Sequence, residues 1–137
     1  MTIEAKGQIR TAMQRVVLIV DDTDHLAATL EVALSGLPET EVVPASDGAE
    51  ALEMLDGGRA VCALVTDLRM PRMDGFELIE RVRADPRLAS LPIIAVSGDT
   101  DPRTPARACQ LGADAFFSKP FSPAGLRQAL VRLIGAR

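Results

Sequence analysis

The stretch VVLIVDD at residues 16–22 joins five apolar residues, four of them β-branched, to two aspartates. A second run, VCALVTD at residues 61–67, has the same form and also ends in an aspartate. Unbroken apolar runs of this length are typical of parallel strands that are buried on both faces of a sheet. We therefore expect two buried strands here, each with acidic residues at its carboxyl end.

Three further apolar runs extend this pattern along the chain. They lie at residues 41–45, 91–96 and 114–118, and segments with helical spacing of apolar residues separate the runs. Strands that alternate with helices predict an α/β fold, in which right-handed crossovers build a doubly wound sheet with helices on both faces. Ligands of such sheets bind beyond the carboxyl ends of the strands.

The expected helices carry start and stop signals. A fourth helix, at residues 103–111, begins among prolines but ends at Gly112, a residue type common after helices. Polar side chains that accept hydrogen bonds from the first helical turn precede other helices. These capping candidates are Asp47 with Glu50, Asp74 with Glu77, and Ser122 before Pro123.

The composition limits the classes of function. The 137 residues make one domain, and a net charge of −4 with four aromatic residues disfavours nucleic acid as a direct partner. No run approaches the ~18 apolar residues of a membrane span, and residues 1–15 lack the apolar middle of a signal peptide, so we expect a cytoplasmic protein without membrane contact. Cys62 and Cys109 lie in no C-x-x-C pair, which favours two reduced and mostly buried thiols.

Five polar residues follow the expected strands: Asp21, Asp22, Asp67, Ser97 and Lys119. Three carboxylates at one edge repel one another without a cation, and Mg²⁺ prefers such oxygen ligands. A carboxylate nucleophile with a lysine and a hydroxyl also suits phosphoryl transfer. Taken singly, each residue fits an ordinary role as well, because aspartates cap helices, Ser-Gly forms turns and lysines lie on surfaces.

Several stretches resemble the receiver domain of two-component response regulators. They have the order and spacing of that family's motifs, and together they span most of the chain. The matching stretches are VVLIVDD at 16–22, TDLRMPRMDGFEL at 66–78, AVSG at 95–98 and GADAFFSKPF at 112–121.

The resemblance implies a complete architecture. It predicts a flavodoxin-like, doubly wound, five-stranded parallel sheet of order 2-1-3-4-5 with five helices. Residues 16–137 would form the receiver domain, and residues 1–15 would be an N-terminal extension, either an added arm or a misassigned start.

The resemblance also assigns the acidic residues. Asp67 corresponds to the phosphoacceptor. Asp21, Asp22 and Asp67, together with the backbone carbonyl of Arg69, correspond to the Mg²⁺ ligands. The other motif residues would shape the loop after Asp67 and cap the next helix without taking part in transfer; they are Met70, Pro71, Asp74 and Gly75.

Three other residues acquire roles in the same way. Ser97 takes the position of the hydroxyl that hydrogen-bonds the acyl phosphate, and Lys119 that of the lysine that pairs with it, with a cis Lys119–Pro120 bond. Phe116 corresponds to the aromatic switch residue that moves inward with Ser97. The alternative is that Phe116 is plain core packing and that the neighbouring Phe117 makes the surface contact instead.

Some positions depart from the family pattern. Arg69 and Asp99 occupy the two positions that modulate the lifetime of the phosphoryl group, and their opposite charges predict an ion pair over the site, or else two separately solvated side chains. His25, the single histidine, is interpreted as an exposed helix-start residue in preference to a phosphoryl donor.

The leading functional hypothesis is a stand-alone receiver. Asp67 would take a phosphoryl group from a histidine kinase or phosphotransfer protein, and the surface around the fourth helix, fifth strand and fifth helix would then bind a partner protein. Such a protein is not a turnover enzyme, and it would be a monomer or a phosphorylation-dependent dimer. The alternatives are a relay shuttle or phosphate sink, and an aspartate-nucleophile phosphatase, which is disfavoured because Arg69 replaces its usual acid/base aspartate.

Overall fold

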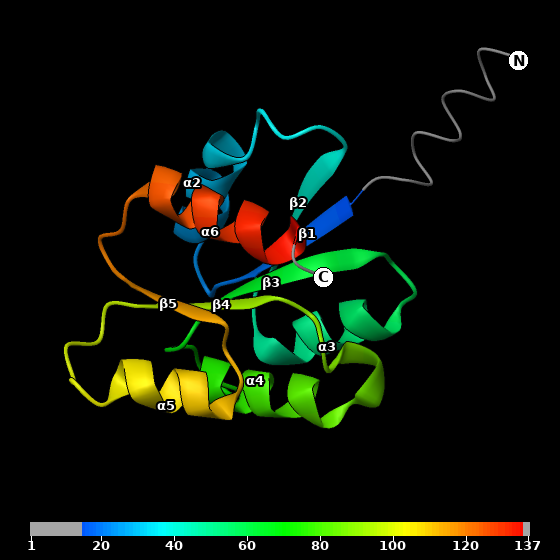
Figure 1. Cartoon of the computed structure of the whole chain (residues 1–137). Coiled ribbons are helices and arrows are strands. Elements are labelled where there is room, and N and C mark those ends of the chain that lie inside the picture. The colour runs from blue at the N-terminus through cyan, green and yellow to red at the C-terminus, as the bar shows by residue number, and fades with distance from the viewer. Residues whose placement is uncertain (1–14, 136–137) are drawn as a thin grey trace, which may run out of the picture.

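The computed structural model describes residues 15–135, which form one parallel sheet between two layers of helices (Figure 1). The strand order is β2-β1-β3-β4-β5, so the predicted order and fold class are confirmed. The strands are β1 (Arg15–Val20), β2 (Thr40–Ala45), β3 (Val61–Asp67), β4 (Ile93–Ser97) and β5 (Ala115–Ser118).

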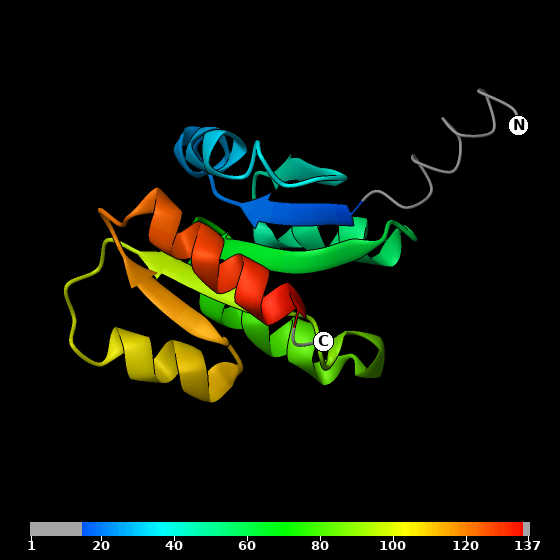
Figure 2. The same ribbon diagram turned by 45° about the horizontal axis from the view of Figure 1, so that its top comes forward.

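The helices divide between the two faces of the sheet, as Figure 2 shows. One layer contains α2 (His25–Ala33) and α6 (Pro123–Gly135), and the other contains α3 (Gly48–Asp56), α4 (Gly75–Ala84) and α5 (Thr104–Leu111). A short 3-10 helix, η1 (Pro86–Leu88), follows α4. The five predicted helices are therefore present.

Strand β1 is buried on both faces because each layer of helices packs against it. Val16, Leu18 and Val20 belong to the apolar cluster under α3, α4 and α5, whereas Val17 and Ile19 belong to the cluster under α2 and α6. This two-sided burial explains why the strand reads as an unbroken apolar run and not as an alternating one.

The predicted caps are present. Asp47 accepts a hydrogen bond from the Glu50 N–H and Asp74 from the Glu77 N–H, each at 2.9 Å. The hydroxyl oxygen of Ser122 accepts from the Gly125 N–H at 3.1 Å at the start of α6. These bonds satisfy backbone donors that the first helical turn leaves free.

One prediction about the chain needs correction. Cys109 is exposed, because it lies on the outer side of α5, and Cys62 is half-buried, so the expectation of two mostly buried thiols is wrong for Cys109. Burial raises the pKa of the Cys62 thiol. The predicted N-terminal extension lies outside the described residues except for Arg15, which already belongs to β1. Among residues 15–135, no helix is long and apolar enough to cross a bilayer.

Arg83 joins α4 to the turns that precede β4 and β5. Its guanidinium donates to the carbonyls of Gly112 at 3.0 Å, of Leu88 at 3.1 Å and of Ala89 at 3.1 Å, and to the Asp114 carboxylate at 3.2 Å. Gly112 has a φ of 127°, and a side chain there would meet the Arg83 Cγ at 2.5 Å. Glycine is therefore required at the end of α5 both by the backbone and by the packed arginine.

We expect Arg83→Ala to lower the free energy of unfolding by about 2–3 kcal/mol, because several carbonyls lose a charged donor at a half-buried site. Urea denaturation followed by circular dichroism measures this change. Arg81→Ala is the matched control on the same helix, because within residues 15–135 Arg81 has a single ion pair, the exposed one with Glu77 at 2.9 Å. Its cost should stay below about 0.5 kcal/mol, and equal costs for the two variants would contradict the role given to Arg83.

Candidate functional site

The carboxyl edge of the sheet gathers the residues singled out in the sequence. Asp67 ends β3 and pairs in register with Val96 of β4, directly before Ser97. Ser97 in turn pairs with Ser118, which ends β5. The backbone N–H of Lys119 then donates to the Ser97 carbonyl at 2.9 Å. The parallel register thus brings the ends of β3, β4 and β5 to one place.

Asp67 and Lys119 form the centre of the site. The Asp67 side chain is 7% exposed, and one of its carboxylate oxygens lies 2.5 Å from the Lys119 Nζ. The other oxygen accepts the backbone N–H of Arg69 at 2.9 Å. Lys119 is followed by a cis peptide bond to Pro120, as the resemblance implied. The buried Asp67 carboxylate at the sheet edge therefore has one oxygen paired with the Lys119 ammonium and the other bonded to the Arg69 N–H.

Ser97 is fully buried next to this pair. Its hydroxyl oxygen accepts the backbone N–H of Asp99 at 3.0 Å. The described contacts include no hydrogen bond between Ser97 and Asp67. In this structure the Ser97 hydroxyl is therefore held by the loop that follows β4, through the Asp99 N–H.

The other two aspartates do not share one environment. Asp21 is 5% exposed, and its Oδ2 accepts the Thr23 hydroxyl at 3.0 Å and the Leu26 N–H at 3.1 Å, so it organises the start of α2. Asp22 is exposed. Within residues 15–135, no group of three or more acidic, histidine or cysteine side chains is close enough to hold a metal ion. Val20 pairs with Thr66, so Asp21 and Asp67 follow at the ends of two neighbouring strands. In this arrangement Asp21 accepts donors from the start of α2, and Asp67 pairs with Lys119.

Phe116 and Phe117 point to opposite layers because they are neighbours on one strand. Phe116 is half-buried and packs against the cluster under α3, α4 and α5. Phe117 packs on the other side, with its ring 6.3 Å from that of Phe121 in an edge arrangement. Of the two, only Phe116 faces the layer that contains α5.

The loops after β3 and β4 are joined by the predicted ion pair. The Arg69 guanidinium donates to the Asp99 carboxylate, and this hydrogen bond holds the pKa of Asp99 below its ordinary value. Asp99 also accepts the Thr104 hydroxyl at 3.1 Å and the Asp101 N–H at 2.8 Å. Nearby, Arg103 lowers the pKa of Asp101 to about 2. The prediction of an ion pair at these two positions is confirmed.

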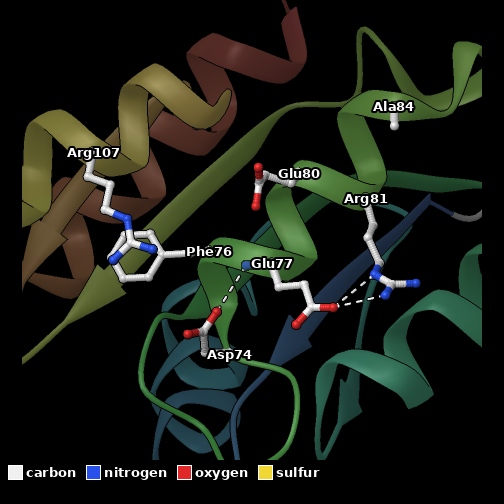
Figure 3. Close-up of a pocket in the computed structure, with 7 residues that line it drawn as sticks. All are labelled: Asp74, Phe76, Glu77, Glu80, Arg81, Ala84 and Arg107. Carbon is white, nitrogen blue, oxygen red and sulfur yellow. Dashed lines mark hydrogen bonds and ion pairs between the residues drawn. The ribbon is translucent and has the colours of Figure 1, made fainter.

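A groove of about 660 Å³ lies between α4 and α5, beside the loop that carries Arg69 (Figure 3). Phe76 is 2% exposed, and the Arg107 guanidinium of α5 covers its ring at 3.8 Å from the centroid. Arg69 approaches the same ring at 5.5 Å. The lining residues are Asp74, Phe76, Glu77, Glu80, Arg81, Ala84 and Arg107.

Two side chains that the sequence did not single out complete the surroundings of the site. Arg72 pairs with Asp47, the cap of α3, at 2.5 Å, and Arg107 stacks on Phe76. Nothing in the local spacing marks either contact, because each joins segments that are far apart in the chain. His25 is exposed at the start of α2, as expected, and borders a hollow of about 260 Å³ that Lys119 also lines.

Comparisons with known proteins agree with this arrangement. The response regulator receiver domain family matches residues 17–131. Chemotaxis protein CheY1 of Helicobacter pylori is 34% identical over 118 residues, which are 86% of this chain and 95% of that protein. Chemotaxis protein CheY of Pseudomonas aeruginosa is 35% identical over 117 residues, 85% of this chain and 94% of that protein. The high-resolution structure of chemotaxis response regulator CheY4 of Vibrio cholerae superposes with a TM-score of 0.77 at 30% identity, and the match covers 88% of this chain and 99% of that one.

Proposed function

This chain belongs to the response regulator receiver domain family, and from that membership we propose that Asp67 takes a phosphoryl group from a phosphohistidine protein and so switches a partner-binding surface. The donor would be a histidine kinase or a histidine phosphotransfer protein in the cytoplasm. The single observation that supports this role best is the buried Asp67 carboxylate, held by Lys119 at the carboxyl edge of the sheet.

The transfer follows from this geometry. A carboxylate oxygen of Asp67 attacks the phosphorus atom, a P–O bond forms, and the P–N bond to the donor imidazole breaks. The imidazole nitrogen keeps the electron pair of that bond and takes up a proton from water. The backbone N–H of Arg69, 2.9 Å from one Asp67 oxygen, orients the carboxylate before attack.

Lys119 and Ser97 act on the phosphoryl group after transfer. The Lys119 ammonium lies against Asp67 already and can neutralise charge on a phosphoryl oxygen without a large movement. Ser97 would donate its hydroxyl to another phosphoryl oxygen, which requires it to leave the Asp99 N–H. We propose that Phe116, on the strand that follows α5, moves with Ser97 and changes the surface of α5, β5 and α6.

The donor set at this edge suits Mg²⁺. Asp22 is exposed, and among residues 15–135 each Asp67 carboxylate oxygen accepts a single donor, Lys119 or the Arg69 N–H. Over the same residues, the Oδ1 of Asp21 accepts only the long 3.3 Å bond from the Thr23 N–H. Asp21, Asp22, Asp67 and the backbone carbonyl of Arg69 would supply oxygen ligands, directly or through the several waters that a protein-bound Mg²⁺ keeps. A bound ion would neutralise charge on the oxygens of the transferred group.

We expect chelation of divalent metal to reduce phosphorylation by a small acyl phosphate at least about tenfold, because the carboxylates alone repel the incoming phosphoryl group. Intact-mass measurement after incubation with acetyl phosphate, in Mg²⁺ or in EDTA, tests this. Restoration of labelling by excess Mg²⁺ is the control for damage by the chelator. Equal labelling in both conditions would contradict a metal requirement.

Turnover in this proposal is limited to slow hydrolysis of the aspartyl phosphate. The Arg69 side chain, whose backbone N–H contacts Asp67, would hinder the approach of water whether it pairs with Asp99 or with the phosphoryl group. The protein would act by shifting a population of surface conformations toward one that binds an effector, as a monomer or a phosphorylation-dependent dimer.

A further inference from the structure

Helix α5 is held to the phosphoacceptor loop at its first residue. Thr104 begins α5, is 3% exposed, and donates its hydroxyl to the Asp99 Oδ2 at 3.1 Å. The same Oδ2 accepts the Arg69 guanidinium. Arg69 lies two residues after Asp67, and its N–H is bonded to the Asp67 carboxylate. A continuous chain of polar contacts therefore runs from Asp67 to the start of α5.

A second contact holds the next turn of the helix. Arg107 of α5 stacks on the Phe76 ring, as Figure 3 shows, at 3.8 Å from its centroid. Arg69 lies 5.5 Å from that centroid. Phe76 follows Gly75, whose N–H donates to the Leu68 carbonyl at 3.1 Å directly after Asp67. Both contacts of α5 therefore lead to Arg69. The Thr104 contact reaches Arg69 through Asp99, and Arg107 stacks on the Phe76 ring that Arg69 also approaches.

The apolar packing of α5 is light. Only Thr104 and Ala108 are buried among its eight residues, whereas α4 buries five of its ten. A helix with so little buried apolar surface depends more than its neighbours on polar contacts for its position. The two contacts described above are thus well placed to set the position of α5.

We propose that Arg69 is a tether that positions α5 in the unphosphorylated protein and releases it when Asp67 carries a phosphoryl group. This inference rests on the proposed function. A phosphoryl group adds a charge of about −1.5 to −2 beside the Arg69 backbone and offers oxygens that bind guanidinium more strongly than one shared carboxylate does. Arg69 then leaves Asp99. The Asp99 carboxylate, which accepts the Thr104 hydroxyl, loses the positive charge that held it in place, and the first turn of α5 becomes more mobile. Arg69 acts through Asp99 and is a positioning residue.

Hydrogen–deuterium exchange of the backbone amides at residues 107–111 tests the tether, with the full-length protein compared in its free form and with beryllofluoride and Mg²⁺. In the free protein, we expect Arg69→Gln to speed exchange in α5 by about two- to five-fold, the factor that one exposed ion pair provides. Beryllofluoride should produce a similar acceleration in the wild type and little further change in the variant. Arg72→Gln is the matched control, because Arg72 lies in the same loop but pairs with Asp47.

Asp99→Asn supplies a second test, since it keeps an oxygen for Thr104 but removes the charge that holds Arg69. It should reproduce the effect of Arg69→Gln, and the double variant should exchange no faster than either single variant. Arg69→Lys should restore part of the protection. Additive effects of the two single variants, or wild-type exchange in Arg69→Gln, would overturn the tether. Failure of the wild type to bind beryllofluoride, followed by ¹⁹F NMR, would instead overturn the proposed function together with the release step.

Discussion

Asp67→Asn is expected to lower phosphorylation by acetyl phosphate in Mg²⁺ at least about a hundredfold, below the detection limit of intact-mass analysis. A neutral amide does not attack phosphorus as a carboxylate does, and it removes the charge that holds Lys119 at 2.5 Å. The substitution keeps the size of the side chain, so the sheet edge around it should remain folded.

The matched control is Asp74→Asn. Asp74 is an aspartate of the same loop, but its side chain caps α4, a role that asparagine also fills. This variant should be labelled as fast as the wild type, with an unchanged circular dichroism spectrum for both proteins. Full labelling of Asp67→Asn would refute Asp67 as the phosphoacceptor, and mapping the modified peptide would then identify the true acceptor.

Gly75→Ala is the substitution with the largest expected effect on stability. A Cβ at this position would lie 2.3 Å from the Asp67 carbonyl oxygen and 2.8 Å from the Leu68 Cα. Both are backbone atoms at the end of β3, so the clash can be relieved only by moving α4 or the strand. We expect a loss of about 3 kcal/mol or more in the free energy of unfolding, measured by urea denaturation.

The same variant should also phosphorylate more slowly, because any shift of the Asp67 backbone moves the carboxylate relative to Lys119. Gly125→Ala is the control. A Cβ there would meet Ser122 atoms at an ordinary 3.5 Å, and alanine favours the helix by up to about 1 kcal/mol. If Gly75→Ala were as stable as the wild type, the close approach between α4 and β3 would not exist in solution.

The alternation of strands and helices could be predicted because it depends on local patterns, whereas the strand order was predicted from the family resemblance. Burial of β1 on both faces leaves a continuous apolar run, and the caps at Asp47 and Asp74 depend on residues only three positions away. The edge location of Asp67, Ser97 and Lys119 also follows, since the carboxyl ends of parallel strands meet.

The details that the sequence could not supply are contacts across elements. The hydrogen bonds by which Asp21 organises the start of α2 are one example, because they depend on how that segment folds over the strand end. Cys109 was expected to be buried, but the helical spacing of α5 alone does not determine which side of it meets α4. The stacking of Arg107 on Phe76 depends on the packing of α5 against α4, and no residue spacing within either helix encodes it.

The ion pair between Asp67 and Lys119 also bears on the order in which the site is assembled during synthesis. Asp67 and Lys119 are 52 positions apart, and the lysine reaches the carboxylate only after β5 has joined β4. A ribosome-bound chain that has released β1, β3 and α4 from the exit tunnel already presents Asp67, but without its cation. Under the proposed function, we therefore expect a chain that ends before β5 to accept phosphoryl groups far more slowly than the complete protein, because its Asp67 lacks the lysine.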